Sequence, residues 1–160
     1  DDDVIISVLG VPNSHSQCIW YKWNGVNDIK SLTYLGNSAI TGLGLLVHNG
    51  VSGAPGNKVG VLYGGIFFNA LSTSVTLNSS SWNNFVITRD STTTTMYNNG
   101  SFVASTNSTP NSSTSNLNLI IGDPYVCGGN VGSVYFYNRA LSAQEVLQNY
   151  NAQKGRFGLS

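Results

Sequence analysis

The chain has little charge, little cysteine and a single glutamate. Only 9% of its 160 residues are charged, and seven Lys and Arg balance seven Asp and Glu. Nucleic acids and anionic membranes are bound through a concentrated positive field, so this neutrality argues against both as partners. No apolar run approaches the ~20 residues that cross a bilayer, and no basic segment followed by an apolar stretch marks a signal peptide. We therefore expect neither nucleic-acid binding nor membrane insertion.

Acids and bases are too few to build most catalytic sites, because general acid–base chemistry needs positioned titratable groups. A glycosidase needs two carboxyl groups across the scissile bond. Asp28, Asp90 and Asp123 all fall in turn-like sequence, where Asp is common for backbone reasons. No G-x-S-x-G motif is present, and we interpret His48 as an exposed histidine at a strand end. The sequence predicts no enzyme activity.

The two cysteines, Cys18 and Cys127, lie far apart and form no CxxC pair. A zinc or redox site is therefore not expected. Two free thiols that pack as small hydrophobic groups are the favoured interpretation, and a disulfide between them is the alternative.

What the chain does have is apolar and neutral polar residues in alternation. Apolar residues make up 41% of the sequence, 53 residues are Ser, Thr or Asn, and 18 are Gly. This mixture favours short strands and turns over long charged helices. A dozen short strands at close spacing predict an all-β fold, a two-sheet antiparallel sandwich. The predicted strands are 4–9, 18–23, 32–35, 43–48, 59–63, 66–68, 75–77, 85–88, 94–97, 102–104, 117–121 and 131–137.

Two hairpins and one helix have specific local signals. Asn99-Gly100 supplies the positive φ angles of a type I′ turn, and a second turn is expected at residues 89–91. Ser142 and Glu145 have the spacing of a capping box, which predicts a helix that ends near Gly155. The polar stretch 105–116 has no apolar residue to bury, so it is either a mobile loop or a crossover between sheets.

Four motifs follow one another in an order typical of a known family. They are WNNFVIT at 82–88, YNNG at 97–100, IG at 121–122 and YNRALSAQE at 137–145. This order resembles the laminin-G-like domains of the concanavalin A-like lectin/glucanase superfamily. The resemblance implies a jelly-roll sandwich with one short C-terminal helix. It also implies a single domain over residues 1–160, which could be the C-terminal part of a longer protein, and it places Trp20 and Trp82 at core positions.

The resemblance also indicates which residues could bind ligands at one rim of the sandwich. Tyr125 offers an aromatic face, Asp123 a charged acceptor, and the side chains of Asn98, Asn99 and Asn130 offer amide groups for sugar hydroxyls. Gly132 and Ser133 stand where the family often has acids, so no role is expected for that position. No cofactor is required.

Calcium is the one metal for which the sequence offers a candidate site. It binds six to eight oxygen ligands and favours carboxylates. Asp1, Asp2 and Asp123 could converge on one rim and form such a site.

We predict a non-catalytic surface module that binds glycans or other surface proteins. The segment 149–159 is similar to the ends of phage and marine viral structural proteins, which favours a virion decoration or fibre domain at the virion surface. The alternative is a secreted or cell-surface bacterial carbohydrate-binding or adhesion domain, which would be extracellular. Oligomerisation stays open.

Overall fold

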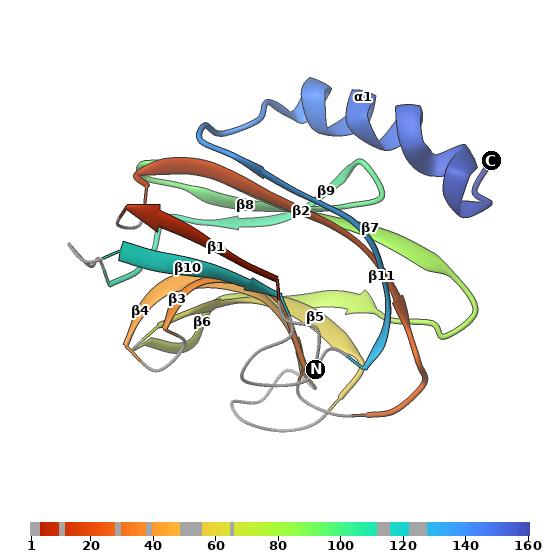
Figure 1. The fold of residues 1–160 in the computed structure, drawn as a ribbon, viewed down its shortest axis with the longest axis horizontal. Helices are drawn as coiled ribbons and strands as arrows, with labels where there is room; N and C mark the ends of the chain where they lie inside the picture. The colour runs from red at the N-terminus through yellow and green to blue at the C-terminus, as the bar shows by residue number, and fades with distance from the viewer. Residues whose placement is uncertain are drawn as a thin grey trace.

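The computed structural model describes residues 4–9, 12–27, 30–37, 40–48, 56–64, 66–111, 116–121 and 128–160, with the backbone alone for 4–9, 30, 37, 66–74 and 116–121. Eleven strands in these residues form two antiparallel sheets that face each other, with one α-helix on the outside (Figure 1). This arrangement is the predicted jelly-roll sandwich.

The first sheet has six strands in the order β1-β10-β3-β4-β5-β6. Their bounds are β1 Val4–Leu9, β3 Lys30–Asn37, β4 Thr41–His48, β5 Lys58–Tyr63, β6 Ile66–Thr76 and β10 Asn116–Ile121. The second sheet has five strands in the order β11-β2-β7-β8-β9. They are β2 Ser14–Trp23, β7 Trp82–Asp90, β8 Thr94–Asn98, β9 Ser101–Thr106 and β11 Gly129–Tyr137.

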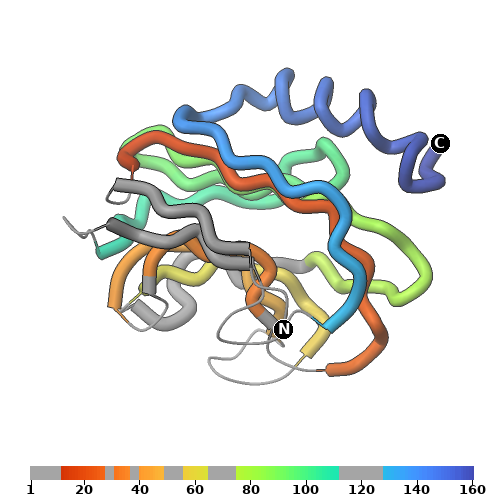
Figure 2. Tube along the Cα trace, in the orientation of Figure 1, coloured from red at the N-terminus to blue at the C-terminus, as the bar shows by residue number. Residues whose placement is uncertain are grey.

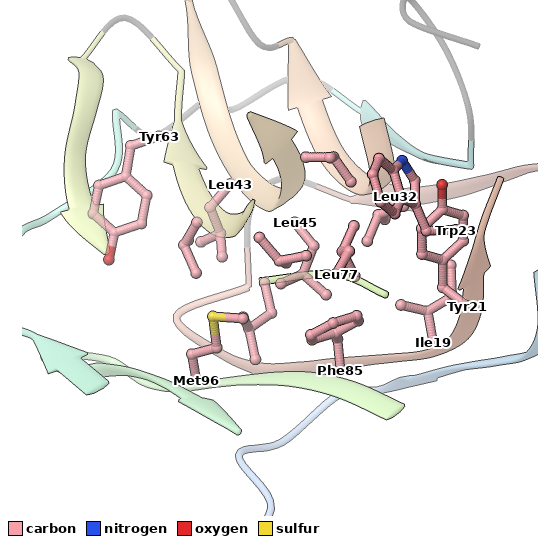
Figure 3. Packing of buried hydrophobic residues seen from close by; sticks show 14 residues of the cluster. Ile19, Tyr21, Trp23, Leu32, Leu43, Leu45, Tyr63, Leu77, Phe85 and Met96 are labelled. Carbon is pink, nitrogen blue, oxygen red and sulfur yellow. The ribbon is translucent and has the colours of Figure 1, made fainter. Parts of the chain in front are cut away.

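The core lies between the sheets because strand side chains alternate between two faces. Ile19 and Phe85 of the five-stranded sheet are fully buried against Leu43 and Leu45 of the six-stranded sheet. Figure 3 shows these side chains pointing toward one another. Each such side chain stabilises the fold by roughly 1.5–3 kcal/mol relative to an exposed one, so burial of both inner faces holds the sheets together.

The predicted strands are confirmed, with one merger. The run 66–68 and the first two residues of the run 75–77 lie at the two ends of a single strand, β6, and Leu77 follows that strand. The turn between β8 and β9 has φ of +49° at Asn99 and +78° at Gly100, as a type I′ turn requires. Of the two interpretations of residues 105–116, the crossover is correct, because β9 belongs to one sheet and β10 to the other.

The C-terminal segment covers the outer face of the five-stranded sheet. It comprises α1 (Ala143–Gln153) and a 3₁₀ turn, η1 (Lys154–Phe157). In Figure 2 this segment lies above β11 and β2. The capping box is present: Ser142 Oγ accepts from the Glu145 N–H, and the Glu145 carboxylate accepts from the Ser142 N–H.

The predicted end of this helix is confirmed to within two residues, because α1 ends at Gln153, and η1 then extends the segment to Phe157. Gly155 lies inside η1, and the glycine with a left-handed conformation is Gly158, at φ +73°. Tyr150 and Phe157 explain the extension, since both rings stack on Trp20 and hold η1 against the sheet.

Two further expectations concern His48 and the cysteines. His48 is buried at the end of β4, with 1% of its surface exposed, so the expectation of an exposed histidine is wrong.

Cys18 is a buried free thiol that packs with Val86 and Val146, and this burial raises its pKa to about 12. Cys127 lies outside the described residues.

Candidate functional site

Four of the predicted site residues lie outside the described residues: Asp1, Asp2, Asp123 and Tyr125. The described strands nearest to them in sequence are paired, with Val4 of β1 opposite Ile121 of β10. The proposed calcium and ligand roles of these four residues therefore stay predictions.

Asn99 and Asn98 hold the β8–β9 turn against β7. Asn99 donates its backbone N–H to the Asn84 carbonyl oxygen (2.8 Å), and its Oδ1 accepts from the Asn84 N–H (2.8 Å). The Asn98 amide nitrogen lies 3.5 Å from Asn83 Oδ1 and from the Asn84 carbonyl oxygen. Both amides contact the protein's own backbone, and both remain partly accessible.

Asn130 lies at the same end of the five-stranded sheet but on another strand. It pairs with Lys22, and Trp82 pairs with the same Lys22 from the other side. Strands β2 and β7 stand between β11 and β8, so three strand spacings, about 14 Å, separate β11 from β8. The structure thus brings Asn130 to the end of the sheet where Asn98 lies, without bringing the two into contact.

Asn130, Lys22 and Trp82 form a row across three strands, which we call the Trp82 row. Asn130 is exposed, and Lys22 and Trp82 are half-buried. The prediction that Trp82 lies in the core is therefore wrong, because its side chain is only half-buried. The alternation between Trp20 and Lys22 on one strand was the signal that could have indicated this row.

Trp20 is buried as predicted, but beneath the C-terminal segment rather than between the sheets. Its ring stacks on Phe157 with 4.1 Å between centroids and on Tyr150 with 5.7 Å. The indole N–H donates to Gln153 Oε1 (3.1 Å). A small pocket beside this contact is lined by Cys18, Tyr137 and Asn149 among others.

The two described acids both have structural partners. Asp90 Oδ1 accepts from the backbone N–H groups of Thr93 (2.8 Å) and Thr92 (3.2 Å), and these bonds lower the pKa of Asp90. Glu145 forms two hydrogen bonds with Arg139, at 2.7 and 2.9 Å. The Arg139 bonds, followed by the bond from the Ser142 N–H, lower the pKa of Glu145 to about 2. A carboxyl group with that pKa stays ionised and is unsuited to act as a general acid.

A buried polar cluster joins the two sheets at the opposite end of β7. Arg89 is 4% exposed and donates to Thr94 Oγ1 (3.0 Å) and to the Ser91 carbonyl oxygen (2.9 Å). Tyr63 of the other sheet donates to the same Thr94 hydroxyl (2.6 Å). Because the partners of Arg89 are neutral protein oxygens, this cluster is structural.

The described residues offer neither clustered metal ligands nor a long apolar helix. That part of the chain holds no group of three His, Cys, Asp or Glu side chains placed to bind a metal ion. It also holds no helix with the length and apolar character to cross a bilayer.

Comparison with known proteins identifies the family and the fold. A family described as the concanavalin A-like lectin/glucanases superfamily matches residues 2–147. A comparison with curated protein sequences found no significant match.

Among solved structures, domain 4 of an extracellular arabinanase from Geobacillus stearothermophilus, in complex with arabinotriose, is similar with a TM-score of 0.68 and 17% identity. This chain covers 66% of that domain, and the match uses 86% of this chain. The CBM40 of a Ruminococcus gnavus sialidase, bound to α2,3-sialyllactose, has a TM-score of 0.60 and 16% identity over 88% of this chain and 84% of its own.

Two further solved structures, a pentraxin and a sialidase, are also similar to this chain. A heptameric pentraxin from Limulus polyphemus has a TM-score of 0.64 and 13% identity, over 88% of this chain and 70% of its own. Trypanosoma rangeli sialidase has a TM-score of 0.66 and 16% identity over 88% of this chain, which spans only 23% of that enzyme. At these identities the likeness shows the fold, which resembles that of carbohydrate-binding modules.

Proposed function

The chain belongs to the concanavalin A-like lectin/glucanase superfamily, and we propose that it is a non-catalytic carbohydrate-binding module of an extracellular or particle-surface protein. The observation that carries this proposal is the fold match to two domains whose structures are complexes with oligosaccharides, over 86% and 88% of this chain. The structural roles of Asp90 and Glu145 support binding rather than hydrolysis, since neither is available as one of a pair of catalytic carboxyl groups.

The direct test is a glycan array with the whole chain, followed by titration of the best ligands. We expect reversible binding to at least one glycan class and no release of reducing ends. Absence of binding across neutral and acidic glycans would overturn the proposal, and turnover that disappears in an Asp28→Asn or Asp123→Asn variant would replace it with an enzyme.

Tyr125, which falls between β10 and β11 in the sequence, is the contact that we propose. Tyr125→Ala should abolish glycan binding and leave the melting temperature within a few degrees, because an aromatic side chain that serves as a ligand contact on a rigid scaffold contributes to binding more than to stability. Tyr135→Ala is a suitable control, because Tyr135 is partly exposed, at 38%, and lies on the sheet face beside α1. Unchanged affinity in Tyr125→Ala would place the site elsewhere.

The similarity of residues 149–159 to viral structural proteins is the basis for proposing a virion as the larger assembly. The genes beside the full-length gene test this context. Capsid or tail genes would support the virion, and secretion or glycoside hydrolase genes would support the bacterial alternative.

A further inference from the structure

The Trp82 row lies on the outer face of the five-stranded sheet, where α1 and η1 end. Side chains directly opposite each other in an antiparallel pair share a face, so Lys22 lies on the same face as Trp82 and Asn130. Trp82 also contacts Phe157, with 4.9 Å between ring centroids, and Phe157 lies on the outer face of Trp20. The row therefore borders the C-terminal segment and faces solvent.

The described charged groups at this place, Lys22 and Arg156, are both positive. Lys22 forms no ion pair in the part of the chain that the structure describes, and the Arg156 guanidinium lies 5.9 Å from the centre of the Phe157 ring. The described acids are remote: Asp90 ends the strand that Trp82 begins, about 27 Å away along β7. Glu145 lies in the first turn of α1, at the other end from Arg156, and is paired with Arg139.

These groups match the chemistry of one ligand class. A half-buried indole offers a flat apolar surface to a sugar ring, and the exposed amide of Asn130 can donate to and accept from hydroxyl groups. Ammonium and guanidinium groups form strong hydrogen bonds to an anionic oxygen. A neutral sugar would use the indole and the amide, and it would offer no anionic group to Lys22 or Arg156.

We propose that the Trp82 row, with Arg156 beside it, is a subsite for an acidic saccharide, one that carries a carboxylate or sulfate group on the ring. This inference rests on the proposed carbohydrate-binding function and narrows it to a ligand charge and a place. The indole carries the ring, Lys22 and Arg156 bind the anionic group, and Asn130 binds a hydroxyl group.

The test is calorimetric titration of the whole chain with matched acidic and neutral ligands. Trigalacturonate is compared with its methyl ester, 3′-sialyllactose with its methyl ester, and a sulfated galactan fragment with the unsulfated one. We expect the acidic member of at least one pair to bind about tenfold more tightly than its neutral partner, and the difference to shrink in high salt. The pair that shows the difference identifies carboxylate or sulfate as the anionic group.

Lys22→Met keeps the aliphatic stem and removes the charge. We expect it to reduce that preference, because Arg156 alone then faces the anionic group, and to leave the neutral ligand's affinity unchanged. Lys58→Met is the matched control, because Lys58 is also half-buried on a strand but belongs to the other sheet. A second readout needs no variant: the indole N–H signal of Trp82 should shift on titration in a ¹⁵N spectrum, whereas that of buried Trp23 should not.

The outcomes separate the two proposals. Equal affinity for acidic and neutral partners would overturn the acidic subsite and leave the carbohydrate-binding function standing. Acid-selective binding that Lys22→Met does not change, with no shift at Trp82, would overturn this location. Binding of no saccharide would overturn both.

Discussion

At the scale of single residues, Gly132 is required for space rather than for backbone conformation. It lies in a bulge of β11, where the register with β2 shifts between Val131 and Val134. A Cβ atom at this position would come within 2.6 Å of the Phe157 ring and 3.1 Å of Trp20 Cβ. Absence of a side chain therefore lets Phe157 reach Trp20.

Gly132→Ala should destabilise the protein by about 1–3 kcal/mol, the usual cost of adding a methyl group to a packed site. Urea unfolding measures this as a lower midpoint with an unchanged slope. Gly155→Ala is the control, because a Cβ at Gly155 meets no atom within 4 Å, and its midpoint should not fall. Equal midpoints for Gly132→Ala and wild type would contradict the packing of Phe157.

His15 makes the stability of the fold depend on pH. Its ring is fully buried, Nδ1 donates to the Pro12 carbonyl oxygen (3.0 Å), and Nε2 accepts from the Gln17 amide (3.3 Å). Burial lowers the pKa of His15 to about 4 from an ordinary value of 6.5, against the opposing bond to Pro12, and the nearby Arg89 charge lowers it further.

Between pH 6.5 and 4 the unfolded chain therefore binds a proton at His15 that the folded chain does not. The stabilisation is complete above pH 6.5, and about 3 kcal/mol is lost as pH falls to 4. Urea midpoints measured across this range should fall less steeply in His15→Gln. The same series in His48→Gln measures how much His48 contributes to the pH dependence of stability, because the pKa of His48 is also lowered by burial and by Lys58. Equal pH slopes in His15→Gln and wild type would contradict the assignment.

Glu145 acts in a separate window, because its pKa is lowered to about 2 from 4.5. Its contribution is complete above pH 4.5 and is lost as pH falls toward 2. The two residues can therefore be distinguished in one pH series.

At the scale of elements, the capping box decides where α1 begins. Ser142 accepts from the Glu145 N–H (3.2 Å), and Leu141 and Val146 are both buried beside Cys18. Ser142→Ala should cost about 1 kcal/mol, seen as a lower urea midpoint. Ser105→Ala, at an exposed position of β9, should leave the midpoint unchanged, and a Ser142→Ala variant as stable as that control would count against the cap.

Local signals predicted these elements well because the chemistry that defines them is local. Positive φ at Asn99-Gly100 and the spacing from Ser142 to Glu145 need no knowledge of the rest of the fold. The extension of the C-terminal segment beyond Gln153 into η1 was not predictable in the same way. It depends on the packing of Phe157 on Trp20, and these two residues are far apart in the sequence.

The candidate site was harder to predict than the strands. Alternation shows which side chains share a face of a strand, but it does not show which face another element covers. Trp20 and Trp82 both lie on the outer face, yet only Trp20 is fully buried, because the C-terminal segment ends over it. The Trp82 row depends on three strands that are far apart in the chain, and only their register brings Asn130 beside Lys22.

At the scale of the whole molecule, the distribution of charge matters more than its sum of zero. Three acids stand at the N-terminus, at positions 1–3, and Asp123 follows β10 by two residues. The pairing of Val4 with Ile121 shows that the described strands next to them end side by side. Repulsion between carboxylates that meet would be relieved by a divalent cation, and calcium accepts carboxylate ligands in flexible geometry.

If Asp1, Asp2 and Asp123 bind calcium, the ion stabilises the folded state by mass action. At a concentration 100 times the dissociation constant the gain is about 2.7 kcal/mol, which for a chain of this size raises the melting temperature by roughly 5–10 °C. Thermal unfolding with millimolar calcium and then with excess chelator measures the shift and its reversal. Asp123→Asn should abolish the response, whereas Asp90→Asn should retain it, because the Asp90 carboxylate is bound to the turn between β7 and β8. Melting temperatures that do not change with calcium or chelator would rule out this site, and the acidic N-terminus would then have no stabilising role through metal binding.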